Sequence, residues 1–257
     1  MAVSLDVDKV LLAVATTHMK DSYECVMCWC ETEKKLLRPV TNLKDKSWDL
    51  GTFTVGNRYK FNVVELPPVE KAILPHQNED MIVGNEVIPM AKDRKPLAQN
   101  ELYAKLRDYG KLFVTDIFGN DNIKEDKYIN KGVNCASAGI LHCNTDYIRF
   151  YYDDRRRKLR CVIKVEGKQD LDFPCSAQYI PDKSDIEKSV NRECLVLLGL
   201  ARGFHRDGDR EHHKKKRCYI LVIGVLMESP VSEVLKSESL SRNLESRKTE
   251  LLASGTH

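Results

Sequence analysis

Three cysteines near the N-terminus, Cys25, Cys28 and Cys30, have a spacing that invites comparison with a zinc site. Two thiolates can bind one Zn²⁺ when a tight turn separates them, and a structural site needs a second pair of ligands. The residues between these cysteines are typical of a strand rather than a turn, and His18 is the one nearby candidate for a fourth ligand. Apolar packing is therefore the favoured interpretation, and the three cysteines are weak candidates for a metal site.

A stronger chemical signal is a pair of basic clusters in the second half of the chain. Residues 149–160 contain six Lys or Arg against two acids, and residues 202–217 contain seven against three. Each cluster carries a net +4, so the other 229 residues carry −5. Clustered cations bind a phosphate backbone by releasing its counterions. The candidate nucleic-acid-binding residues are Arg155, Arg156, Arg157, Arg202, Phe204, Lys214, Lys215, Lys216 and Arg217.

Aromatic residues flank the basic clusters and could stack on bases. Tyr147, Phe150, Tyr151 and Tyr152 lie beside the first cluster, and Phe204 lies within the second. Because side chains alternate between the two faces of a strand, about half of these rings should belong to the core. The alternative for both clusters is that they are solvated hairpin tips with no ligand.

A third candidate site combines one arginine with a polar loop. Arg38 stands before a proline at the end of an expected strand, where its guanidinium could hold a phosphate through two hydrogen bonds. His76, Gln77 and Asp80 place further hydrogen-bonding groups in one loop. The alternative, slightly favoured, is that Arg38 pairs with Glu79 or Asp80 and fixes this loop to the neighbouring strands.

The sequence contains no recognisable catalytic motif. It has no phosphate-binding P-loop, no glycine-rich dinucleotide fingerprint, no Gly-x-Ser-x-Gly and no His-Glu-x-x-His. Paired carboxylates such as Asp153 and Asp154 could bind a metal, but nothing around them requires one. We therefore favour a non-enzymatic function without a cofactor.

Composition narrows the class of protein. The chain has 257 residues, of which 42% are hydrophobic and 31% charged, so it can bury a core. Nine cysteines, an odd number, and an N-terminus without a basic segment favour a reducing cytoplasm over export. The longest apolar runs are about half of what a membrane span requires, so no membrane association is expected.

Hydrophobic patterning predicts a mainly β protein with a few helices. Most segments are short strands bounded by polar turns, and the best helix is expected over residues 97–109. Trp48 is expected to belong to the core. Two strand-rich halves suit tandem small OB-like β-barrels. The predicted domains are a first barrel over 1–92, a helix-bearing linker over 93–132, a second barrel over 133–230 and a polar, helical or frayed tail over 231–257.

Three short segments together resemble the dual OB-containing domain family of prokaryotic conflict, or anti-phage, systems. They are Leu37-Arg38-Pro39-Val40 followed by Trp48, then Pro75-His76-Gln77-Asn78-Glu79-Asp80, and finally Cys194-Leu195-Val196-Leu197-Leu198-Gly199 followed by Tyr219-Ile220-Leu221-Val222-Ile223. The resemblance covers roughly residues 9–228. It implies two OB-type barrels in tandem, with a nucleotide or nucleic acid as the expected ligand.

The leading functional hypothesis is a non-catalytic sensor that binds nucleic acid or a nucleotide, within an antiviral defence system. The alternative is an interaction adaptor whose acidic first half and C-terminal tail dock an effector protein. A small metal-dependent hydrolase is a third, weaker hypothesis.

Overall fold

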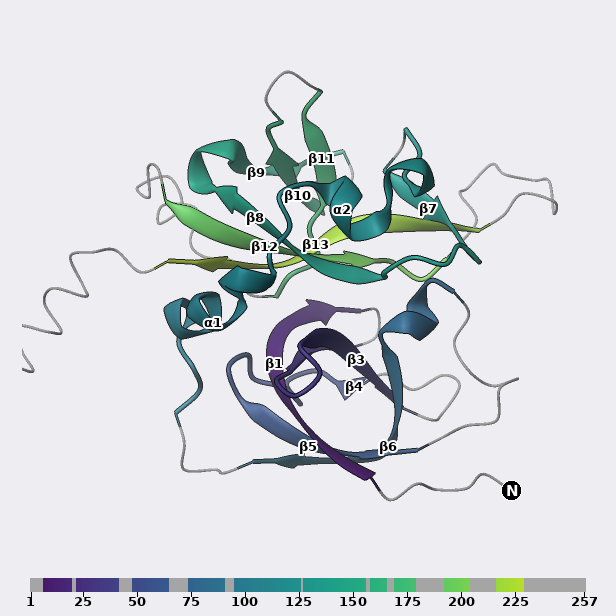
Figure 1. Cartoon of the computed structure of the whole chain (residues 1–257), viewed down its shortest axis with the longest axis vertical. Helices are drawn as coiled ribbons and strands as arrows, with labels where there is room; N and C mark the ends of the chain where they lie inside the picture. The colour runs from purple at the N-terminus through teal and green to yellow at the C-terminus, as the bar shows by residue number, and fades with distance from the viewer. Residues whose placement is uncertain are drawn as a thin grey trace, which may run out of the picture.

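The computed structural model describes residues 7–19, 22–41, 48–64, 74–90, 95–125, 127–155, 158–165, 169–178, 192–203 and 216–228. The predicted mainly β fold class with small barrels is confirmed, and Figure 1 shows the two strand-rich halves stacked on each other. The predicted tail over 231–257 lies outside these residues.

The first half closes into a barrel of five strands. Its strands are β1 (Val7–His18), β2 (Tyr23–Cys30), β3 (Lys35–Thr41), β5 (Arg58–Val63) and β6 (Asp80–Pro89). They follow the order β1-β2-β3-β6-β5 and return to β1, and only the β3–β6 pair is parallel. A short strand, β4 (Trp48–Asp49), extends β2. Numbered along the chain, the barrel strands therefore run 1-2-3-5-4-1.

One bent strand allows this barrel to close. The first part of β1 pairs with β5 and its second part pairs with β2, with a register irregularity between Ala13 and Ala15 at the change of partner. Bulges bend a strand and increase its twist, as barrel closure requires. The interior is filled by buried apolar side chains, among them Leu11, Phe61 and Trp48, so Trp48 belongs to the core as predicted.

The second half follows the same route with a split first strand. Strands β8 (Ala138–Asn144) and β9 (Ile148–Asp153) are joined end to end by the 3-10 turn η5 (Thr145–Tyr147), and β10 (Lys158–Ile163), β11 (Leu171–Pro174), β12 (Glu193–Leu200) and β13 (Arg217–Met227) follow. One sheet has the order β9-β10-β11, and the other has β8-β12-β13 with a short extra strand, β7 (Tyr128–Asn130). A single parallel bridge between Cys175 and Val222 links the two sheets.

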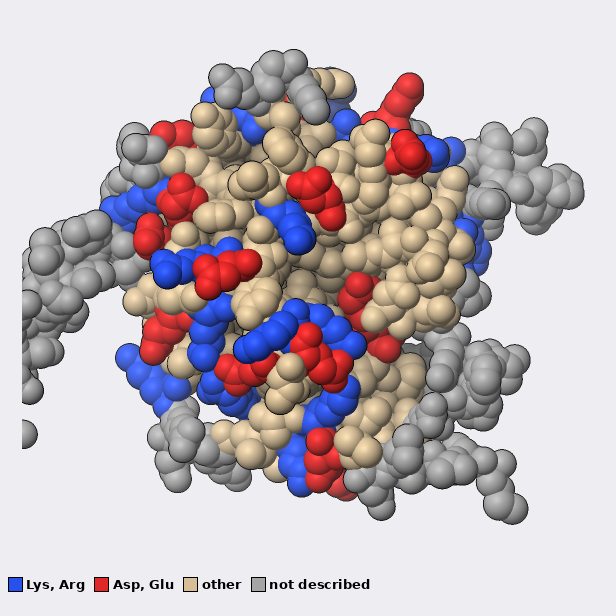
Figure 2. Space-filling view, viewed as in Figure 1, with Lys and Arg blue, Asp and Glu red and all other residues tan. Residues whose placement is uncertain are grey.

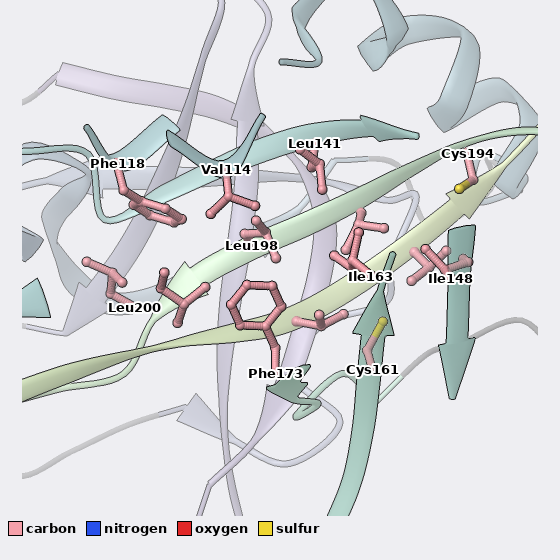
Figure 3. Close-up of a cluster of buried hydrophobic side chains, with 14 of the residues drawn as sticks. Val114, Phe118, Leu141, Ile148, Cys161, Ile163, Phe173, Cys194, Leu198 and Leu200 are labelled. Atoms are coloured by element: carbon pink, nitrogen blue, oxygen red, sulfur yellow. The ribbon is translucent and has the colours of Figure 1, made fainter. Parts of the chain in front are cut away.

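This second half forms a curled half-barrel around its own core. If β8 and β9 count as one strand, the order is again 1-2-3-5-4-1, with strands 3 and 5 parallel at their one bridge. Figure 3 shows Phe173, Cys161 and Ile163 pointing toward Leu198 and Leu200 across the half-barrel. All nine cysteines are free thiols, and six of them line or border this core.

A third apolar cluster joins the two halves. It combines outward-facing side chains of β1, β2 and β3 with those of β8, β12 and β13, and Leu102, Tyr103 and Leu106 of α1 (Gln99–Leu106) complete it. The backbones approach closely at Gly224, where an added Cβ would lie 3.3 Å from the Cβ of Ala15. The halves therefore share one continuous core, as Figure 1 suggests from the position of α1 beside the junction.

The segment between the halves contains short helices. The helix expected over 97–109 is present as α1, continued by η3 (Arg107–Tyr109). Beyond it lie α2 (Val114–Phe118) and η4 (Asn120–Asn122), and η2 (His76–Asn78) stands earlier, just before β6. Within the described part of the chain, no helix is long and apolar enough to cross a membrane.

Candidate nucleic-acid interface

A cluster of polar side chains, most of them buried, lies where β3 and β6 meet the second half. We call it the buried cluster; it consists of Arg38, His76, Glu79, Asp80, Ser137 and Arg202. Its centre is the Asp80 carboxylate, whose side chain is 1% exposed. Arg38 donates from Nε to Asp80 Oδ1 at 2.6 Å, and Arg202 donates from Nη1 to Oδ2 at 2.9 Å.

The strand order explains this convergence. Arg38 and Asp80 are register partners on the parallel pair β3 and β6, and the backbone N–H of Arg38 donates to the carbonyl of Glu79. Leu37 points into the first barrel, so alternation along β3 directs Arg38 outward toward the second half. The alternative interpretation of Arg38, an internal ion pair with the loop, is thus the arrangement found.

The second half satisfies the remaining polar groups of the cluster. Ser137 donates to Glu79 Oε2 twice, from its backbone N at 2.8 Å and from its hydroxyl at 2.6 Å. Burial nevertheless raises the pKa of Glu79, although Ser137 and Arg38 act in the opposite direction. Of the four candidates Arg38, His76, Gln77 and Asp80, only Gln77 is exposed. The cluster therefore holds the halves together and offers little surface to a ligand.

His76 is a buried titratable group within this cluster. Its ring is 3% exposed, and its Nε2 lies 3.1 Å from the carbonyl oxygen of Leu200. Burial, followed by the nearby charges of Arg38 and Arg202, lowers the pKa of His76 to about 4 from 6.5. The folded protein therefore holds a neutral imidazole at pH values where the unfolded chain would be protonated.

This pKa shift predicts a loss of stability in mild acid. The unfolded state binds a proton that the folded state does not between pH 6.5 and pH 4, so stability falls as the pH falls through that window. Across this window, the pKa shift of His76 lowers the free energy of unfolding by about 3 kcal/mol in total. Urea unfolding from pH 7.5 to pH 4 should therefore show a shallower pH dependence for His76→Gln than for the natural protein. Parallel stability curves for the two proteins would contradict this prediction.

The predicted basic residues lie at two loops of the second half. Arg155 is exposed in the turn between β9 and β10, and Arg202 follows β12. Lys216 and Arg217 stand at the start of β13. The other predicted residues, Arg156, Arg157, Phe204, Lys214 and Lys215, lie outside the described residues.

Between these loops, the outer surface of β9, β10 and β11 carries a polar network. We call it the outer face; it consists of Arg149, Tyr151, Lys158, Arg160 and Asp172. The Tyr151 hydroxyl donates to Asp172 Oδ2 at 2.8 Å, so its side chain reaches from β9 across β10 to β11. Arg160 donates to Asp172 Oδ1 at 2.9 Å, and the Arg149 guanidinium lies 5.9 Å from the centre of the Tyr151 ring.

Alternation along the strands creates this surface. Phe150 and Cys161 point into the half-barrel, so their neighbours Tyr151 and Arg160 point outward. Of the four aromatic residues beside the first cluster, Phe150 alone belongs to the core, whereas Tyr147 and Tyr152 are 45% and 57% exposed and Tyr151 lies on the outer face, so fewer than the expected half are buried. Asp172 was not a sequence-level candidate, because an isolated aspartate in a short strand gives no signal.

The corresponding surface of the first barrel is covered. Met27 and Trp29 of β2 and Leu36 of β3 point outward into the shared apolar cluster. The Trp29 ring lies 4.6 Å, centre to centre, from that of Tyr109, just beyond α1. Glu31 accepts from Arg58 and from Lys105 of α1, and Figure 2 shows charged residues of both signs next to one another over α1. Among the residues that the structure describes, only the second half therefore presents the outer surface of its second and third strands.

The cysteines of β2 do not converge on one ion. Cys28 and Cys30 point into the first barrel, whereas Met27 and Trp29 point out of it, so alternation places Cys25 on the opposite side from Cys28. Burial raises the pKa of Cys28 well above its usual range, which disfavours the thiolate that a metal would bind. In the described part of the chain, no three His, Cys, Asp or Glu side chains are grouped to hold a metal.

Comparisons with known proteins assign no family. No family model matches the sequence, and no curated protein matches it. A solved structure described as "Structural mimicry for functional antagonism" aligns with 87% of this chain and 93% of its own, at a TM-score of 0.33 and 9% sequence identity. A likeness at this level supports no argument about fold family or function.

Proposed function

We propose that this chain is a non-catalytic nucleic-acid-binding protein made of two OB-type barrels, in which the second barrel holds the ligand. The strand order 1-2-3-5-4-1 with a parallel 3–5 pair supports the OB assignment of both halves. OB-type barrels bind oligonucleotides on the outer surface of strands 2 and 3 and through the loops that follow strands 1 and 4.

One observation carries the proposal: the two basic clusters of the sequence span those two loops of one barrel and the strand ends beside them. Residues 154–157 join its first and second strands, and residues 201–216 join its fourth and fifth. The outer face between these loops supplies a tyrosine ring with a guanidinium above it. Such a surface can neutralise phosphates and stack a base, in the manner of single-strand-binding grooves.

In this proposal the first barrel supports the second and does not itself bind the oligonucleotide. Its own strand 2–3 surface packs against the second half through Met27, Trp29 and Leu36, so it is not open to an oligonucleotide. The proposal keeps the resemblance to the dual OB-containing family of anti-phage systems, and it assigns the sensing role in such a system to the second barrel.

The salt dependence of binding tests this proposal. Anisotropy titrations with a fluorescent 20-nucleotide strand should show affinity that falls steeply between 50 and 200 mM NaCl. The triple variant Arg149→Ala, Arg155→Ala, Lys158→Ala should reduce the log–log salt slope by about 2, because each lost phosphate contact removes about 0.7. The matched control replaces Lys34, Lys35 and Lys60 of the first barrel by alanine and should leave the slope unchanged. Salt-independent affinity, or an equal loss in the control, would contradict the proposal.

An adaptor is the second candidate function, and one observation favours it. Leu112 and Phe113, which precede α2, are 70% and 53% exposed as neighbours in the chain. Exposed apolar groups of this size mark protein contacts when they form part of a larger patch. The change Leu112→Ser with Phe113→Ser should abolish capture of an effector if the chain is an adaptor, and should leave oligonucleotide affinity unchanged if the first proposal holds.

A further inference from the structure

A second aromatic and basic surface lies where β7 pairs with the first residues of β13. We call it the ledge; it consists of Tyr128, Arg217 and Tyr219. The rings of Tyr128 and Tyr219 lie 5.6 Å apart, centre to centre, at an angle of 51°. The Arg217 guanidinium lies over the Tyr128 ring, 4.8 Å from its centre.

The extra strand β7 creates this arrangement. It is absent from the five-strand route that the two halves share, and it pairs with the first residues of β13, with Tyr128 opposite Tyr219 and Asn130 opposite Arg217. Ile129 and Cys218 are fully buried in the core of the second half, so alternation points Tyr128 and Tyr219 to the other side. A left-handed residue, Lys127 at φ 58°, turns the chain into β7.

Further cations lie on the opposite side of this strand pair. An added Cβ at Gly203 would be 3.2 Å from the side chains of Lys131 and Lys216 and 3.3 Å from the Sγ of Cys218, so these lysines lie on the side of the buried Cys218. The backbone N–H of Lys131 donates to the carbonyl of Lys216 at 2.8 Å. Arg202 is anchored on Asp80, and its side chain is 54% exposed. Arg217 is therefore the cation that lies on the ring side of the strand pair.

A guanidinium that lies over a tyrosine ring suits one class of ligand. Unpaired bases stack on aromatic side chains and on arginine planes, while their phosphates contact nearby cations. A duplex keeps its bases stacked on each other inside the helix, so it cannot offer a base face to this surface. The chemistry of the ledge therefore distinguishes single strands from duplexes, which phosphate contacts alone do not.

We propose that the ledge is a stacking site for one base of a single-stranded nucleic acid, and that it selects single strands over duplexes. This inference rests on the proposed function, because it assumes that the chain binds nucleic acid. The base stacks beside the Arg217 guanidinium and the tilted rings of Tyr128 and Tyr219.

A 20-nucleotide thymidine strand with one central 2-aminopurine, and the same strand in a duplex, test this inference. Binding of the single strand should quench 2-aminopurine fluorescence through stacking. Tyr128→Leu should remove the quenching and weaken single-strand affinity about 5- to 150-fold, the range measured for one stacked base. Tyr128→Phe keeps the ring and should stay within about twofold of the natural protein. The salt slope should not change in either variant, since no cation is lost.

The outcomes separate the two proposals. If the natural protein binds neither strand nor duplex, the proposed function fails. If it binds the strand but Tyr128→Leu binds equally well, or binds strand and duplex with the same loss, the ledge is not a stacking site while the proposed function stands. Tyr219→Leu provides a second variant should Tyr128→Leu unfold, and circular dichroism with thermal melting identifies that case.

Discussion

Replacement of Asp80 by alanine should destabilise the folded protein by about 3–5 kcal/mol, the cost of leaving a buried charge without its partner. Asp80 is 1% exposed and accepts from Arg38, whose side chain is 7% exposed, so the variant would bury a guanidinium without its carboxylate. Arg202 would lose its anchor at the same time. Urea unfolding at pH 7.5, followed by far-UV circular dichroism, measures this loss directly.

The matched control for Asp80 is an aspartate in an exposed pair. Asp8 lies 2.5 Å from Lys60, with both side chains at least one third exposed, so Asp8→Ala should cost less than about 1 kcal/mol. The double change Asp80→Ala with Arg38→Leu should recover part of the loss, because it removes the unpaired charge as well. Equal, small losses for Asp80→Ala and Asp8→Ala would show that the buried cluster does not stabilise the fold.

The second large effect is expected at the junction of the barrels. Trp29→Ala should cost about 3–5 kcal/mol, as for other buried tryptophans, because Trp29 is 3% exposed within the cluster shared by both halves. The loss should lower the stability of β12 and β13 as much as that of β2. Amide hydrogen exchange measures both halves in one experiment, since the most protected amides exchange only through global unfolding.

Ile88→Ala is the control for this junction. Ile88 is an apolar residue of the first barrel that is 52% exposed, so its truncation should change stability by less than about 0.5 kcal/mol. If Trp29→Ala accelerates exchange in the first half and leaves β12 and β13 fully protected, the two barrels unfold separately and the shared core is not a cooperative unit.

Local sequence patterns predicted the secondary-structure elements better than they predicted which strands pair with one another. The helix expected over 97–109 is present as α1 and η3, and Trp48 lies in the core as expected. The Arg38–Asp80 pair, by contrast, depends on β3 and β6 being parallel neighbours. No local pattern contains that information, so the sequence left a phosphate site and an internal ion pair as alternatives.

The ledge could not be predicted from the sequence for a different reason. Strand β7 has three residues and lies in a polar stretch, residues 119–132, that the sequence indicates to be a loop. Three residues are too few for the alternation of a strand to be recognised in the sequence. Tyr128 becomes a candidate binding residue only in the structure, where the pairing of β7 with β13 places it opposite Tyr219. Arg217, which lies over the Tyr128 ring, was predicted from the clustering of charge along the chain, which does not depend on knowing which strands pair.

The junction of the barrels also has a direction. In terms of repeat proteins, the chain is an array of two units that meet through unlike surfaces, with strands 1, 2 and 3 of the first against strands 1, 4 and 5 of the second. On the β1–β5–β6 surface of the first barrel, Val10 and Ile88 flank Lys60 with its Asp8 ion pair. That surface therefore carries exposed charge where the junction is apolar.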